Sequence, residues 1–221
     1  AAVQRVFVFS FDVEHMATGS VIRAQKAVPE FLTTQFQAGD VGGIVVAGTM
    51  VNKRLTSVGE ELRAAVAGIK PTPDARSREL DMREWPRIES LYEATRVSVG
   101  DDKVIEHLVY RACADDKERC EDARPQVLGK ARALAGQARL SAQRTLSTFE
   151  HLVVGLAPMP GRKTVVYLAD GFSSEDLAGE LQTVIGRAAL ANVRIYAIDT
   201  RGLNRVSADS RILDAAPQER V

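Results

Sequence analysis

The chain has 221 residues, of which 45% are hydrophobic and 26% are charged, and this composition can bury the core of one large domain. Its 29 basic residues are balanced by 29 acidic residues, so it lacks the basic excess typical of nucleic-acid-binding proteins, and we expect no nucleic-acid partner. No apolar run approaches the roughly 18 residues that cross a bilayer, so we expect no transmembrane segment.

Apolar runs and helical periodicity alternate along the first seventy or so residues. The apolar runs VFVFSF and GGIVVAG have no polar face, as in strands that are covered on both sides. We therefore predict strands at about 6–11 and 42–48, and a third, more exposed strand within 49–57. Helices are predicted at about 20–36 and 60–69, where apolar residues recur at three-to-four spacing.

The middle of the chain differs in character. Residues 74–124 are rich in Arg, Glu and Asp, and their apolar residues lie at helical spacing, which predicts an insertion of two or three helices. A long helix is predicted from about Pro125 to the 155–160 region, about 45 Å long if Gly129 and Gly136 do not break it.

A strand, a helix and a last strand are predicted at about 164–170, 176–191 and 193–200. Strands that alternate with helices predict an α/β fold, with a doubly wound, mainly parallel, Rossmann-like sheet flanked by helices. We expect a single domain over residues 1–221 that carries the helical insertion at 74–124.

Three acidic residues follow the predicted strands at their carboxyl ends. Asp12 and Glu14 come after the first strand, and Asp170 ends the strand TVVYLAD. Ligands of doubly wound sheets bind beyond the carboxyl ends of the strands, and carboxylate oxygens suit Mg²⁺ or Ca²⁺. The sequence therefore suggests a divalent-ion site on these three side chains. The alternative is that they are solvated loop residues, or that Asp12 and Asp170 cap helices.

Several kinds of site lack their sequence pattern. The first strand is not followed by a glycine-rich phosphate loop, and GFSSE at 171–175 does not have the GxSxG pattern of a serine hydrolase. The chain contains no HExxH and no CxxC pair. A metal-dependent hydrolase remains a third possibility, because the acids are present but no base or nucleophile is arranged with them.

An ordered set of motifs resembles a known family. The chain resembles the von Willebrand factor A domain in four motifs that together extend over most of its length: FVFSFDVEHM, LYEATRV, PMPGRKTVVYLADGF and VRIYAIDTRGL. The likeness is greatest to the related branch of this family described from Acidobacteria, and it also covers AGD at 38–40. The resemblance implies a protein-interaction or adhesion domain that is exported from the cytoplasm.

In that family a divalent ion occupies a metal-ion-dependent adhesion site. Asp12 matches the Asp of its first motif, whereas Glu14 and Met16 stand in the positions of two serines. Asp170 before Gly171 matches the last motif. The middle threonine of the family has no assigned match, although Thr95 is one candidate.

The two cysteines of the chain, Cys113 and Cys120, lie in CADDKERC. In one continuous helix they would be about 10 Å apart along the axis, too far for a disulfide, so a bridge requires a turn at DDKER. Because the resemblance implies an exported, extracytoplasmic protein, where such a bridge persists, we expect a disulfide, with two free thiols as the alternative.

The leading functional hypothesis is a non-enzymatic module that binds a protein partner at the strand-end face. His15, Met16, Phe172 and Ser173 would surround the acids there, unless Met16 and Phe172 fold back into the core. The alternative is a metal-free structural subunit of a larger assembly that docks through the helical insertion.

Overall fold

A computed structural model describes residues 5–72, 81–171 and 177–202. Within these bounds the chain forms two compact units. The first contains the described residues up to 72 and those from 141 to 202, and the second contains residues 81–140. The second unit thus holds the described part of the predicted insertion together with the beginning of the long helix.

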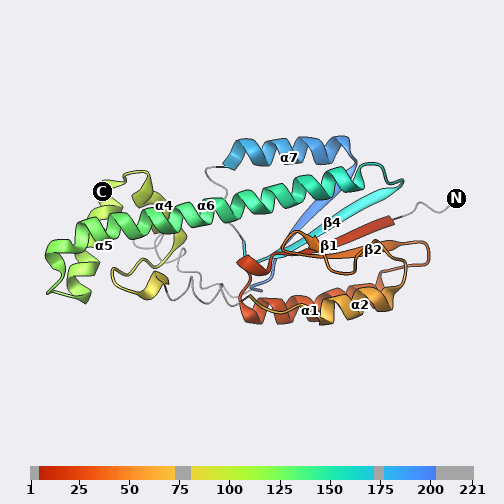
Figure 1. Ribbon diagram of the computed structural model, residues 1–221, viewed down its shortest axis with the longest axis horizontal. Helices are drawn as coiled ribbons and strands as arrows, with labels where there is room; N and C mark the ends of the chain where they lie inside the picture. The colour runs from red at the N-terminus through yellow and green to blue at the C-terminus, as the bar shows by residue number, and fades with distance from the viewer. Residues whose placement is uncertain (1–4, 73–80, 172–176, 203–221) are drawn as a thin grey trace, which may run out of the picture. The chain divides into compact units, whose positions relative to one another are not determined.

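The first unit is built on a sheet whose five described strands lie in the order β3-β2-β1-β4-β5 (Figure 1). Neighbouring strands are parallel except for β2 and β3, which are antiparallel. The strands are β1 (Arg5–Phe11), β2 (Val41–Val46), β3 (Thr49–Met50), β4 (Arg162–Ala169) and β5 (Val193–Asp199). The predicted α/β fold with a mainly parallel sheet flanked by helices is confirmed.

Helices lie on both faces of this sheet. Helices α1 (Thr18–Thr34) and α2 (Gly59–Ala67) lie on one face, and α7 (Ala178–Leu190) lies on the other with the last part of α6 (Ala123–Leu156) (Figure 1). Successive side chains of a strand point to opposite faces, so Phe9 packs with the α1 core and Val8 with the α6–α7 core. Covering on both sides accounts for the unbroken apolar runs of the sequence.

The predicted third strand is much shorter than expected. β3 covers only Thr49–Met50, and a single further bridge joins Thr56 to Gly42. Between them Lys53 has a positive φ of 64°, which a strand cannot accommodate. The Asn52 side-chain oxygen accepts the hydrogen bond of the Ile44 amide at 2.9 Å, so a side chain replaces the missing strand partner there.

An ion pair fixes the beginning of β1 against the turn before β2. Arg5 donates two hydrogen bonds to the Asp40 carboxylate, at 2.8 and 2.6 Å, and the Gln37 amide donates a third at 2.7 Å. Burial acts to raise the pKa of Asp40, but the Arg5 hydrogen bonds, the Gln37 amide and the Arg5 charge outweigh it and hold that pKa below its ordinary value.

The second unit is helical. It contains α4 (Leu91–Ser98), α5 (Asp102–Asp115), the short 3₁₀ helix η2 (Cys120–Asp122) and the first part of α6. Ser90 and Asp101 cap α4 and α5 by accepting hydrogen bonds from backbone amides of the first turns. Trp85 joins the core of this unit, and its indole donates to the Ala112 carbonyl at 2.9 Å.

Two predictions for this region are confirmed. Helix α6 runs unbroken through Gly129 and Gly136 for 34 residues, or about 51 Å. Cys113 and Cys120 form a disulfide, because α5 ends at Asp115 and the polar DDKER segment turns before η2 begins.

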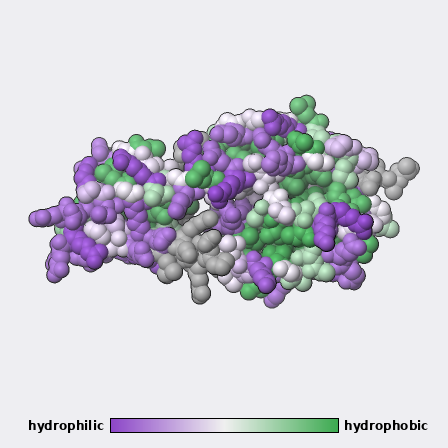
Figure 2. Space-filling model, in the orientation of Figure 1, coloured by the Kyte–Doolittle hydropathy of each residue, from purple (hydrophilic) through white to green (hydrophobic). Residues whose placement is uncertain are grey.

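The surface differs between the units. Figure 2 shows hydrophobic residues gathered over the strands of the first unit, whereas the visible surface of the second unit is largely hydrophilic. Among the described residues, none of the helices combines the length and the hydrophobicity that a membrane span requires.

Candidate functional site

The candidate site begins where β1 ends. Asp12 follows the strand directly, and its amide donates to the Leu168 carbonyl of β4 at 3.0 Å. A turn of 3₁₀ helix, η1 (Val13–His15), then leads into α1. This short turn leaves the Asp12 side chain on the α6 side of the sheet, where it is only 9% exposed.

One carboxylate oxygen of Asp12 collects three hydrogen bonds. Its Oδ2 lies 2.7 Å from His15 Nδ1 and accepts from the hydroxyl of Thr145 at 2.8 Å and from the hydroxyl of Tyr167. Burial acts to raise the pKa of Asp12, but the hydrogen bond and charge of His15 and the two hydroxyl donors outweigh it and lower that pKa. Burial and the Asp12 charge raise the pKa of Tyr167, so its phenol stays protonated and remains a donor.

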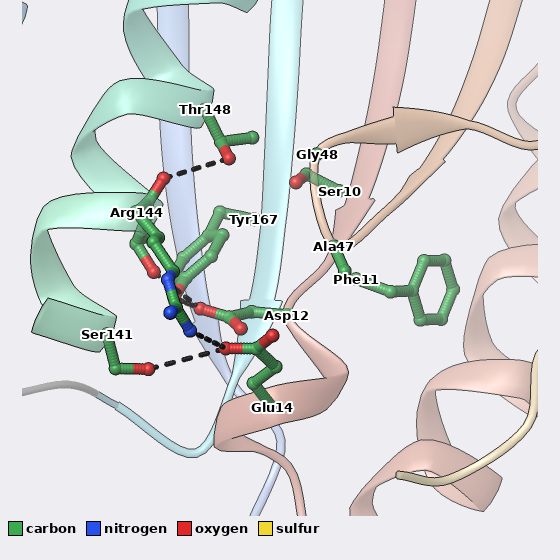
Figure 3. A pocket seen from close by; sticks show the side chains of 11 residues that line it. Ser10, Phe11, Asp12, Glu14, Ala47, Gly48, Ser141, Arg144, Thr148 and Tyr167 are labelled. Carbon is green, nitrogen blue, oxygen red and sulfur yellow. Dashed lines mark hydrogen bonds and ion pairs between the residues drawn. The ribbon is translucent and has the colours of Figure 1, made fainter. Parts of the chain in front are cut away.

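Glu14 faces α6 across an open pocket of about 170 Å³ (Figure 3). Its Oε2 lies 3.5 Å from the Ser141 hydroxyl and 3.8 Å from an Arg144 guanidinium nitrogen. Ser141, Thr145 and Thr148 follow one another at helical spacing along the same side of α6, so their hydroxyls all line the pocket. The pocket therefore presents hydroxyl groups and both signs of charge beside the apolar Phe11 and Ala47.

Asp170 lies in a different network from Asp12 and Glu14. Its Oδ2 accepts from the Ala17 amide and the Ser20 hydroxyl at the start of α1, both at 2.8 Å, and its Oδ1 accepts from the Thr200 hydroxyl at 2.6 Å. Asp170 thus caps the start of α1 and is not among the residues that line the pocket. The predicted cluster of three acids is divided: Asp12 and Glu14 line the pocket together, whereas the Asp170 side chain serves the start of α1, although its amide donates to the His15 carbonyl at 2.8 Å.

The predicted partner-binding residues have different positions. Met16 is 1% exposed and packs in the α1 core, so its expected place on an exposed border was wrong. The His15 side chain is 10% exposed and holds Asp12, which leaves it little surface for a partner. Phe172 and Ser173 lie outside the described residues.

The hydroxyl groups next to the acids come from an element that the sequence motifs did not indicate. Thr95 lies in α4 of the second unit, whereas Ser141 and Thr145 of α6 contact Glu14 and Asp12. The signal was present as three Ser and Thr residues at helical spacing beside the apolar stripe of a long helix. Tyr167 could have been noticed as the one residue with a polar side chain inside VVYLA.

Carboxylate and hydroxyl oxygens are the donors that a hard divalent cation prefers. Asp12, Glu14 and Ser141 offer such oxygens to the pocket. Within the described ranges, no group of three or more His, Cys, Asp and Glu side chains is arranged to hold a metal ion. The fit to an ion therefore rests on two carboxylates supplemented by hydroxyls.

Comparison of this chain with known protein families, with curated proteins and with solved structures finds no match.

Proposed function

We propose that this chain is a von Willebrand factor A-like, non-enzymatic module that binds a protein partner at the carboxyl end of β1. The observation that supports this function best is the open pocket in which Asp12 and Glu14 of one loop face Ser141 and Arg144 of α6. It lies where ligands of parallel sheets bind, and its charged groups can pair with a polar or charged group of a partner.

The chemistry of Asp12 favours binding over catalysis. General acid–base catalysis works best when the pKa of the catalytic group is near the working pH. The lowered pKa of Asp12 makes it a weak base, and the Thr145 and Tyr167 hydroxyls serve as its donors. These features count against Asp12 as a general base.

A Mg²⁺ or Ca²⁺ ion would be held by Asp12, Glu14 and the Ser141 hydroxyl. Bound there, it would supply a positive charge that attracts a carboxylate of the partner. Asp170 leaves the ligand set in this proposal, because its oxygens serve α1 and Thr200.

One contact favours a second candidate, the metal-free structural subunit that docks through its helical unit. Arg144 already places a positive charge 3.8 Å from Glu14, so a cation is not required to balance that carboxylate. In either form we propose an extracytoplasmic location, which the Cys113–Cys120 disulfide supports.

A melting experiment distinguishes the two forms. Mg²⁺ or Ca²⁺ added to chelator-treated protein should raise the melting temperature by mass action, and Glu14→Gln should reduce that gain. Glu30→Gln, which removes an exposed acid of α1, is the matched control and should show the same gain in melting temperature as the parent. A flat response at millimolar ion in all three proteins would reject the ion and leave the metal-free form.

Partner binding is tested separately. Glu14→Lys should remove specific proteins from those captured out of the native extract, whereas Glu30→Lys should retain them. If both variants capture the same proteins as the parent, the strand-end pocket is not the contact surface.

A further inference from the structure

One face of the sheet is only partly covered by helices. A groove of about 820 Å³ runs between α1 and strands β4 and β5, on the face opposite α6 and α7. Alternate residues of β5 point into it, and the apolar ones remain accessible: Tyr196 is 51% and Ile198 is 47% exposed. Parallel sheets normally have both faces buried, but no helix of the described residues covers this half of the face.

The strand register orders the groove by chemistry. Val166 pairs with Tyr196 and Leu168 pairs with Ile198, which gives two apolar rows toward the carboxyl ends of the strands. Toward the amino ends, the lining includes three arginines beside Gln35 and Thr164. Arg162 is the register partner of Arg5, and Arg194 is the partner of Thr164. The groove is therefore apolar over its middle and cationic at the amino end, whereas Arg23 and Asp199 bring charges of opposite sign to its carboxyl end.

The dimensions of the open face fit one helix. Neighbouring strands lie about 4.8 Å apart, so β4 and β5 present a strip about 10 Å wide, which matches the 8–10 Å spacing of packed helices. On the α1 side the wall includes the exposed Ala27, whose small side chain allows another helix to approach closely.

The charge at the cationic end is open to a partner. Arg162 and Arg194 are exposed and make no ion pair with any described residue, whereas Arg5 is paired with Asp40. A helix that brings carboxylates to this end would gain from both free guanidinium groups, and a basic helix would be repelled.

We propose that this groove binds an amphipathic helix of a partner protein, with its apolar stripe on β4 and β5 and acidic residues over Arg162 and Arg194. This site extends the molecule beyond the strand-end pocket, with which it shares no lining residue. The two proposals can therefore fail independently.

The test uses two labelled synthetic peptides and the full chain. Each peptide has about 18 residues, or roughly 27 Å as a helix, slightly longer than a seven-residue strand. Both carry the same Leu and Ala stripe, and one end bears three Glu residues in the first peptide and three Lys residues in the second. Fluorescence anisotropy should show the Glu peptide binding at least about tenfold more tightly than the Lys peptide.

Charge reversal in the groove supplies the decisive control. Arg162→Glu combined with Arg194→Glu should reverse the preference, whereas Arg54→Glu, an exposed arginine outside the groove, should leave it unchanged. Circular dichroism of each variant checks that the fold is intact. Absence of binding by the Glu peptide, equal binding of both peptides, or a preference that survives the double reversal would overturn the proposal.

Two other occupants would be recognised by the same reagents. If the Glu peptide binds only after Ile212→Asp and Leu213→Asp, residues 203–221 of this chain compete for the groove and the proposal is wrong. If the parent forms a dimer that the double arginine reversal dissociates in sedimentation, the occupant is a second copy, which also overturns it.

Discussion

Removing the Tyr167 hydroxyl tests the assigned network around Asp12 most directly. Tyr167→Phe keeps the ring, which packs edge-to-face on Phe149 with centroids 4.9 Å apart, and deletes only the donor to the buried carboxylate. Asp12 Oδ2 is then left with Thr145 and His15.

Hydrogen bonds to charged groups contribute about 1.5–3 kcal/mol each, so we expect the free energy of unfolding to fall by that amount. Thr145→Val removes a second donor to the same oxygen. Because the two donors share one acceptor, the double variant should deviate from additivity by about 0.5 kcal/mol or more.

Urea denaturation followed by far-UV circular dichroism gives the free energies. Trp85, the single tryptophan, belongs to the second unit, so its fluorescence follows that unit separately. Tyr196→Phe is the matched control, since that ring is 51% exposed and its change should stay within about 0.5 kcal/mol. If Tyr167→Phe costs no more than this control, the hydroxyl does not support Asp12 and the reasoning about the site is wrong.

Three further changes test other parts of the fold. Asp40→Asn should lower the free energy of unfolding by about 1–3 kcal/mol at neutral pH. Because the pKa of Asp40 is lowered in the folded protein, this loss of stability relative to the parent should shrink as pH falls below about 4. A loss that does not depend on pH in urea denaturation would contradict the pairing with Arg5. Cys113→Ser should lower the free energy of unfolding by about 2–3 kcal/mol, the value for a disulfide that closes a short loop, as measured by Trp85 fluorescence in urea. An unchanged urea midpoint would contradict a stabilising role of the disulfide. Met16→Ala should lower the free energy of unfolding by about 2–5 kcal/mol in calorimetry, because the Met16 side chain is buried. A loss below about 1 kcal/mol would mean that the Met16 side chain is not packed in the core.

The fold could be predicted from sequence because its signals are local. Unbroken apolar runs indicated strands covered on both faces, and the three-residue to four-residue period indicated the helices between them. The disulfide was expected because the family resemblance implies an exported protein, and the polar run between Cys113 and Cys120 permits the turn that the bridge requires. The third strand is shorter than predicted because the Asn52 side chain, and not a further strand residue, satisfies the Ile44 amide.

The site was predicted less well, because the face on which a side chain lies depends on its parity along the strand. In β1 the even residues, such as Val8, point toward α6 and α7, and Asp12 continues that series. In β4 the even residues, such as Leu168, point toward α1, and Asp170 continues this second series. Acids at the ends of adjacent strands therefore diverge, although the sequence shows both simply as strand ends.

The same alternation explains how one sheet carries two unlike surfaces. On β4, Tyr167 points to the α6 face and completes the polar network of Asp12, while its neighbours Val166 and Leu168 point to the α1 face and form the floor of the groove. A shift of one residue in the pairing of β4 would exchange these sets, leaving Asp12 without its phenol and the groove with a tyrosine in its floor. The β1–β4 register therefore determines both candidate surfaces together, whereas their charged groups, Glu14 and Arg194, belong to separate elements and can be varied one at a time.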